Sequence, residues 1–193
     1  VKIEAAGIGT GFKQYDGVTI SGISEEDEQL KSLNGSKILY QAADNYIVIV
    51  GMLDEAKTVT DTVKVERKVP EMDFVTECQN RLWGCYYGIR DGETVNEIFC
   101  CKLGDFKNWE CYMGISTDSY RASVGTDGVW TGAVTYLGYP MFFKENFLHK
   151  VYVSATGAHQ ITSTALDGVQ KGSADSLAIV ADTLIYKTRT GIA

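Results

Sequence analysis

The chain has 193 residues, 45% of them hydrophobic and 22% charged, which allows one or two domains with a buried core. Its formal net charge of −7 argues against a surface that grips nucleic acid through its phosphates, because that mode needs clustered Lys and Arg. No run approaches the roughly 18 to 20 apolar residues that span a bilayer, so we expect neither nucleic acid nor a membrane as a direct partner.

The N-terminus reads Val1-Lys2-Ile3-Glu4 and has neither an initiator Met nor a signal-peptide pattern. Gly7, Gly9 and Gly11 are spaced somewhat like a phosphate-binding loop, but a strand-like run follows them instead of a helix. We therefore expect a flexible segment here and no nucleotide or other cofactor. We also expect the sequence to be a segment of a larger protein.

Residues 1–68 contain short strand-like runs joined by polar turns. The runs cover 17–22, 36–40, 46–50 and 60–65, and the acidic segment 24–30 reads as a solvated loop or a short helix. This pattern predicts a small antiparallel barrel of the SH3-like or OB-like kind. Because Pro70 ends a strand and the pattern changes after it, we predict two domains, 1–68 and 69–193.

Residues 69–193 carry a strand-rich pattern that occurs twice and begins a third time. The first copy has runs at 74–78, 81–87, 97–103 and 109–112, the second at 132–136, 141–144, 148–153 and 160–163, and the third at 177–180 and 184–188. The copies can be aligned on the second strand-like run of each copy, which follows a turn-like element at 79–80, 138–140 or 181–183. Four short antiparallel strands per unit are typical of a β-propeller blade, so we predict an all-β chain with a partial propeller and a long insertion over 113–130.

All five cysteines fall between Cys78 and Cys111. Their odd number and the adjacent Cys100 and Cys101 argue against a disulfide framework. A zinc site would require Cys78, Cys85, Cys100 and Cys111 to converge, whereas free cysteine is commonly a small buried hydrophobe. We therefore predict reduced core cysteines, no metal site and assembly inside a cell.

The segment 123–130 resembles the Asp-box of sialidase-type propellers, a turn in which an Asp caps backbone amides and a Trp packs between blades. The match lacks the residue between Asp and Gly, and Trp130 follows Gly128 by two positions instead of three. Asp-Gly is also a hairpin signal by itself. We predict a structural turn formed by Thr126, Asp127, Gly128 and Trp130.

No pattern selects catalytic residues. A glycosidase needs two carboxylates about 5 to 10 Å apart, and nothing in the spacing of the candidates chooses a pair. The two histidines form neither a metal motif nor a recognisable triad, so we expect no enzymatic activity. The residues considered are Asp73, Glu77, Glu97, Asp127, His149 and His159.

One arginine and several tyrosines are candidates for an interaction surface, although aromatic residues at strand spacing commonly pack in the core or along edges. The candidates are Arg81, Tyr86, Tyr87, Tyr112 and Tyr120.

Several segments from residue 69 onward carry a specific resemblance. They include Asn80-Arg81-Leu82-Trp83-Gly84, Lys102-Leu103-Gly104-Asp105, Ser116-Thr117-Asp118-Ser119-Tyr120, Phe142-Phe143-Lys144-Glu145-Asn146 and Gly168-Val169-Gln170-Lys171-Gly172-Ser173. The series resembles a family of uncharacterised phage and prophage proteins of gut Firmicutes that are encoded among virion structural genes. The resemblance covers most of 69–193 and, more weakly, 11–13 and 17–22. It departs at Phe106-Lys107, where the family usually has Pro-Thr.

The resemblance implies a non-enzymatic virion structural protein, in the tail or connector, that assembles in the host cytoplasm with other virion proteins and with itself. The alternative is a carbohydrate-binding or glycan-cleaving tail module, because propellers with Asp-box-like turns often handle sugars. Burial of Trp83, Trp109 and Trp130 would favour assembly. Exposed aromatic residues beside paired carboxylates would favour the glycan reading.

Overall fold

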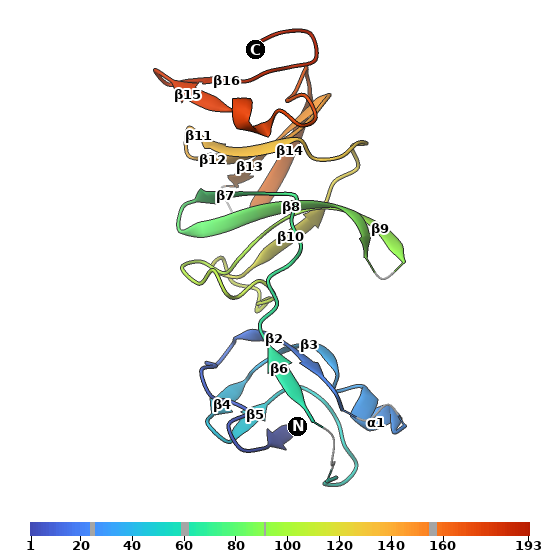
Figure 1. Ribbon diagram of the computed structural model, residues 1–193. Coiled ribbons are helices and arrows are strands. Elements are labelled where there is room, and N and C mark those ends of the chain that lie inside the picture. The colour runs from blue at the N-terminus through green and yellow to red at the C-terminus, as the bar shows by residue number, and fades with distance from the viewer. Residues whose placement is uncertain (24–25, 59–61, 91, 155–157) are drawn as a thin grey trace. The chain divides into compact units, whose positions relative to one another are not determined.

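The computed structural model describes residues 1–23, 26–58, 62–90, 92–154 and 158–193 (Figure 1). The described chain is all-β, with strands β1 to β16, one short helix α1 (Glu28–Lys31) and one 3-10 turn, η1 (Ala174–Ser176). It divides into two compact units. The first unit is Val1–Pro70 with Asp105–Ser119, and the second is Glu71–Gly104 with Tyr120–Ala193. No helix in the described ranges is long and apolar enough to cross a membrane.

The first unit contains two antiparallel three-stranded sheets over one apolar core. One sheet has the order β1 (Lys2–Glu4), β5 (Tyr46–Val48), β4 (Gln41–Ala43), and the other has the order β3 (Gly35–Ile38), β2 (Gly17–Ser21), β6 (Lys64–Glu66). The core between them includes Val18, Ile20, Leu33, Leu39, Ile47 and Ile49. Helix α1 begins after Asp27, whose carboxylate accepts hydrogen bonds from the backbone amides of Gln29 and Leu30 and so caps the first turn.

The predicted barrel is not formed by the described residues. β5 has β1 and β4 as its two neighbours and β2 has β3 and β6, so no strand pairs from one sheet to the other. These strands have only three to five residues. The predicted run at 60–65 lies partly outside the described residues, and β6 begins at Lys64.

Residues 105–119, which the sequence assigned to the second domain, belong to the first unit. The backbone amide of Gly17 donates to Asn108 Oδ1 at 3.1 Å, and Cys111 Sγ donates to the carbonyl oxygen of Tyr15 at 3.1 Å. Ser36 Oγ donates to Glu110 at 2.7 Å. The strand predicted at 109–112 was wrong, because this segment bonds across to residues 15–36 instead of pairing along a sheet edge.

The second unit contains two four-stranded antiparallel sheets, each a simple meander. The first has β7 (Phe74–Cys78), β8 (Arg81–Arg90), β9 (Glu93–Cys100) and β10 (Tyr120–Ser123), and the second has β11 (Gly132–Tyr136), β12 (Tyr139–Lys144), β13 (Phe147–Val153) and β14 (His159–Ala165). A two-stranded hairpin follows, β15 (Ala178–Val180) and β16 (Thr183–Ile185). The fourth strand of the first sheet, β10, lies inside the segment that was predicted to be an insertion.

The three sheets of this unit begin with the same kind of hairpin. Two successive residues with positive φ form each turn: Gln79-Asn80 at 53° and 58°, Leu137-Gly138 at 50° and 78°, and Ala181-Asp182 at 46° and 64°. The flanking residues pair directly, as Cys78 with Arg81 illustrates. Two positive φ values in a two-residue loop define a type I′ turn, whose twist matches that of the strands. The turns predicted at 79–80 and 181–183 therefore lie at equivalent places in the repeat, whereas the turn predicted at 138–140 lies at 137–138, because Tyr139 and Pro140 belong to β12.

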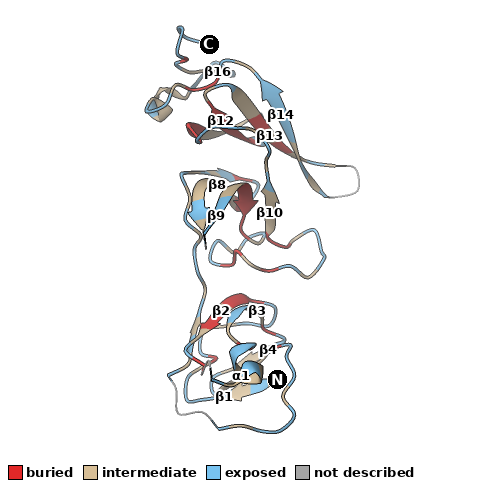
Figure 2. Cartoon of the chain, turned by 90° about the vertical axis from the view of Figure 1, so that its right-hand side faces the viewer, coloured by how far each residue is buried: buried red, intermediate tan, exposed pale blue. Residues whose placement is uncertain are grey.

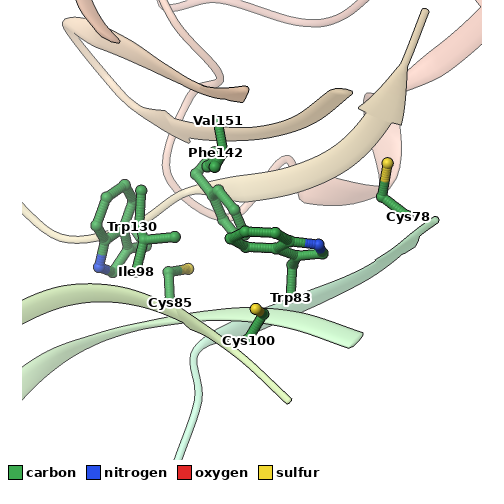
Figure 3. Close-up of a cluster of buried hydrophobic side chains, with 8 residues drawn as sticks. All are labelled: Cys78, Trp83, Cys85, Ile98, Cys100, Trp130, Phe142 and Val151. Atoms are coloured by element: carbon green, nitrogen blue, oxygen red, sulfur yellow. The ribbon is translucent and has the colours of Figure 1, made fainter. Parts of the chain in front are cut away.

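The inner faces of the two four-stranded sheets pack together and form the core of the second unit. Trp83, Cys85 and Ile98 come from the first sheet, and Phe142 and Val151 come from the second (Figure 3). Side chains alternate between the faces of a strand, so β12 directs Met141 and Phe143 to the opposite face. There they pack with Val169 and with partly buried residues in or next to the hairpin β15–β16, Leu177, Leu184 and Tyr186. The assignment of these stacked sheets to propeller blades stays a prediction.

Candidate functional site

The predicted structural turn lies between β10 and β11 and is held by Thr126. The Thr126 carbonyl oxygen accepts from Asn96 Nδ2 at 2.8 Å and from Lys144 Nζ at 2.6 Å, and its hydroxyl bonds His149 Nε2 at 2.8 Å. Gly128 has a φ of 92° and Trp130 is buried. Asp127 is exposed, and its carboxylate makes none of the hydrogen bonds found within the described residues. The contacts of this segment therefore run through Thr126 and Trp130 and not through an Asp cap.

Lys144 is the centre of a polar cluster between the two sheets, which we call the Lys144 cluster: Lys144, Asn96, Thr126, Trp130 and His149. The Lys144 side chain comes from β12, its residue is 1% exposed, and its Nζ lies 3.0 Å from Asn96 Oδ1 and 4.5 Å from the centroid of the Trp130 ring. Burial lowers the pKa of Lys144 to about 8, although Asp127 and Cys85 act in the opposite direction. Two oxygen acceptors and an aromatic face thus compensate a charge that burial alone would penalise strongly.

His149 lies beside this lysine and is fully buried. Its ring is 4.9 Å from the ring of Trp130. Burial lowers the pKa of His149 to about 4, the backbone of Phe142 opposes this effect, and Lys144 adds to it. The imidazole is therefore neutral at pH 7, which is the form that a site next to a buried ammonium favours.

The chemistry of the Lys144 cluster fits a structural role. A lysine with a depressed pKa is a possible nucleophile where a substrate can reach it, but Lys144 is 1% exposed. Its contacts join β12 to β9 through Asn96 and to the segment before β11 through Thr126. The cluster therefore ties the two sheets together.

Four of the five predicted interaction residues lie in the second unit, and these four do not share one face. Arg81 is 5% exposed and donates to the carbonyl oxygen of Cys101 at 2.7 Å. Tyr87 and Tyr120 pack against the core between the sheets, and Tyr86 projects from the other face of β8 under the Arg90 guanidinium. Tyr112 is 47% exposed and belongs to the first unit. The four residues of the second unit therefore do not form one binding surface.

Three of the four carboxylates considered from the sequence, those of Asp73, Glu77 and Glu97, are engaged in structural contacts. Glu97 is 4% exposed and accepts hydrogen bonds from Arg90 at 2.6 Å and from Arg121 at 2.8 Å. Asp73 accepts from the amide of Tyr87 at 2.8 Å, and Glu77 accepts from the amide of Asn80 at 3.1 Å. The Glu97 contacts join neighbouring strands, and the Glu77 contact holds the turn between β7 and β8. These structural roles give no reason to assign a general acid and a general base.

The five cysteines are free and buried. Burial raises the pKa of Cys100 to about 12 and that of Cys85 well above its ordinary value. Cys111 belongs to the first unit, whereas the other four belong to the second. Within the described ranges, no three or more His, Cys, Asp and Glu side chains come together in a way that could hold a metal ion.

The face of the second sheet opposite the first sheet, on which Leu148 also packs with Met141 and Phe143, carries a cavity of about 450 Å³, the outer cavity, which the sequence did not predict. Lys150 Nζ lies 3.6 Å from the centroid of the Tyr139 ring, and the Tyr152 hydroxyl donates to Gln160 Oε1 at 2.8 Å. The lining is aromatic, aliphatic and hydroxylated, with one cation: Tyr139, Leu148, Lys150, Tyr152, Val153, Thr162 and Thr164. Alternation along β13, with Leu148, Lys150 and Tyr152 on one side, is the sequence signal that marks this face.

β14 forms one edge of the same sheet. The sheet order is β11-β12-β13-β14, so β14 is hydrogen-bonded to β13 on one side only among the described residues. Residues 162–165 are exposed, and Figure 2 shows most of the β14 arrow in the colour of exposed residues. The sequence predicted a shorter strand, 160–163, and did not indicate that it lies at an edge.

Comparison with known protein families, with curated proteins and with solved structures finds no match to this chain. The resemblance to phage and prophage proteins is therefore neither supported nor contradicted.

Proposed function

We propose that the chain is a non-enzymatic structural protein of a phage virion, in the tail or the connector, and that it acts through contacts with other virion proteins and with further copies of itself. We also propose that the two four-stranded sheets are propeller-like blades and that the hairpin β15–β16 is the start of a third. Both statements rest on the resemblance of residues 69–193 together with the observations below.

The observation that carries the proposal is the way the sheets of the second unit are stacked. Each sheet buries one face on the preceding one: Phe142 and Val151 pack toward Trp83, and Leu184 and Tyr186 pack toward Phe143. The hairpin itself still exposes apolar side chains, with Ile179 50% and Val180 56% exposed. A unit that continues to present apolar strand surface suits assembly with neighbours.

The tryptophans support assembly over catalysis. Trp83, Trp109 and Trp130 are 3%, 3% and 4% exposed, so their rings serve packing and are not available as stacking platforms. The polar cluster around Lys144 is also buried, and it joins one sheet to the other. Neither feature needs a substrate to explain it.

Mass spectrometry of purified phage particles tests the proposal. Particles are prepared from a lysogen or phage whose genome encodes this chain, and the peptides of the chain are quantified against the major capsid protein. We expect the chain at a fixed ratio in particles that have been freed of unassembled protein on a density gradient. Its presence in the lysate but not in gradient-purified particles would contradict the proposal.

A carbohydrate-binding tail module is a second candidate, and the outer cavity favours it. Tyr139 and Tyr152 supply aromatic surface, and Thr162 and Thr164 supply hydroxyl groups beside Lys150, which is a suitable set for a sugar ring. Among the described residues, no carboxylate lines this cavity, so the geometry favours binding over cleavage.

Calorimetric titration with purified host cell-wall polysaccharide tests this second candidate. We expect the double variant Tyr139→Ala/Tyr152→Ala to abolish the binding heat and Tyr112→Ala, an exposed tyrosine of the first unit, to preserve it. Absence of heat with the unaltered chain, or equal heat with both variants, would contradict carbohydrate binding at the outer cavity.

A further inference from the structure

We propose that β14 is a self-association edge: the β14 strands of two copies pair antiparallel and join their second sheets into one continuous sheet. This inference rests on the proposed function, because it names one surface through which assembly takes place. The inference is based on two observations about β14: one edge of the strand is open, and its sequence lacks the features that usually prevent an open edge from pairing with another strand.

The other edges of the two four-stranded sheets differ from β14. The edge strand β11 lies against β7, where the Thr76 and Thr135 hydroxyl oxygens are 2.9 Å apart. β7 itself contains Glu77, and β10 has only four residues, one of them Arg121. β14 has seven residues and is paired on one side only within the described part of the chain.

Natural proteins blunt exposed edges with charged residues, proline, bulges or a covering loop, because free N–H and C=O groups otherwise recruit another strand. β14 reads His159-Gln160-Ile161-Thr162-Ser163-Thr164-Ala165 and contains no proline and no Asp, Glu, Lys or Arg. Its pairing with β13 is continuous from His159 to Ala165, without a bulge. Its three β-branched residues favour extended backbone. The edge is therefore built to accept a strand.

A second copy of the chain is the occupant that fits this edge. A two-fold axis through Thr162 places the two Thr162 side chains opposite each other, Ile161 opposite Ser163 and Gln160 opposite Thr164. No like charges meet in this register, and hydroxyl pairs across strands are favourable. The seven residues of β14 are all used, because Thr162 is the middle residue of the strand.

Light scattering on the full chain, with substitutions at Thr162, tests the pairing. On the neighbouring strand Thr162 faces Lys150, so Thr162→Glu gains an attractive contact within its own sheet while two such carboxylates repel across the axis. We expect the mass of two copies for the unaltered chain and of one copy for Thr162→Glu. An equimolar mixture of Thr162→Glu and Thr162→Lys should return to the mass of two copies, because opposite charges then meet.

Two further variants serve as a control and as a replacement for Thr162→Glu. Thr94→Glu alters an exposed threonine of β9 and should leave the mass at two copies. Far-UV circular dichroism tests whether Thr162→Glu is folded. If it is not, Thr164→Glu, which faces Gln160 across the axis, is used instead, and we expect it to have the mass of one copy. Hydrogen exchange of the unaltered chain should show β14 amides that become more protected as concentration rises.

The outcomes separate this inference from the proposed function. A mass of one copy at every concentration, or a folded Thr162→Glu that keeps the mass of two copies, overturns pairing through β14, and so does a β14 protected only when a different protein is added. In each case, detection of the chain in purified particles would leave the proposed function standing.

Discussion

Lys144 Nζ donates a hydrogen bond to the carbonyl oxygen of Thr126 at 2.6 Å, across the space between β12 and the segment that precedes β11. The same carbonyl oxygen accepts from Asn96 Nδ2, and Lys144 also donates to Asn96 Oδ1. The three groups form a closed set of hydrogen bonds between the sheets. Because burying an ammonium is costly unless it is well paired, the placement of Asn96 and Thr126 decides whether Lys144 can be accommodated.

Asn96→Ala should destabilise the protein by about 2–4 kcal/mol, because it removes an acceptor from a buried charge and two donors that bind the carbonyl oxygens of Val124 and Thr126. Urea unfolding followed by tryptophan fluorescence measures the change. Asn45→Ala is the control: Asn45 is exposed and accepts one hydrogen bond, from the Gly7 amide at 3.2 Å, so its loss should cost less than about 1 kcal/mol. Equal costs for the two variants would show that the Lys144 cluster does not hold the sheets together.

Gly168→Ala should destabilise the protein by about 2–3 kcal/mol or more, because an added Cβ would overlap the carbonyl oxygen of Lys144 at the β12–β13 hairpin. A backbone atom paired in a sheet cannot move aside as a flexible side chain can. At Gly125 a Cβ meets nothing within 4 Å, so Gly125→Ala should change the free energy of unfolding by less than about 0.5 kcal/mol. Thermal unfolding of the two variants provides the comparison, and tolerance of Gly168→Ala would argue against this close approach.

Leu137→Asn should stabilise the protein by about 0.5–1 kcal/mol. Leu137 has a φ of 50° and is 67% exposed, so it has the steric cost of left-handed backbone without a compensating burial. Asn tolerates this conformation and, before Gly138, completes the preferred type I′ turn sequence. Leu103→Asn, at a partly exposed leucine without positive φ, should bring no gain. A fall in melting temperature for Leu137→Asn would contradict the turn assignment.

The stability of the fold should decrease as the pH falls from about 6.5 to about 4. His149 has an ordinary pKa of 6.5 and a folded pKa of about 4, so the unfolded chain binds a proton in this interval and the folded chain does not. Protons therefore favour unfolding there, by up to about 3 kcal/mol. The burial-lowered pKa of His159 acts in the same direction. His149→Gln should flatten the pH dependence of urea unfolding over this interval, and an unchanged slope would show that His149 is not buried as a neutral ring.

The thiols should be unreactive in the native protein. All five cysteines are buried, and burial raises the pKa of Cys78, Cys85 and Cys100, so little thiolate is present at neutral pH. Ellman's reagent at about pH 8 should detect no thiol in the native chain and all five after denaturation. Rapid reaction of a native thiol would identify a segment that opens.

Much of the strand pattern of the second unit was predictable, because alternation and turn residues act locally. The predicted runs at 74–78 and 132–136 coincide with β7 and β11, and the turn at Gln79-Asn80 has the positive φ values that its hairpin requires. The strand at 109–112 was wrong because Trp109 and Cys111 have strand-like composition, and no local signal reveals that Cys111 bonds to the carbonyl oxygen of Tyr15. The barrel was also wrong, since the order of strand pairing is not a local property.

Short antiparallel strands, and the repetition of the strand-rich pattern after residue 70, could be predicted from the amino-acid sequence alone. The folded chain was needed to see that Lys144 is buried against Thr126 and Asn96, that Glu97 pairs with two arginines, and that β14 lies at an edge of its sheet. The difference arises because alternation and turn conformation depend on residues that are neighbours in the sequence. The burial of a charge and the openness of a strand edge depend instead on which distant strands come to lie beside them.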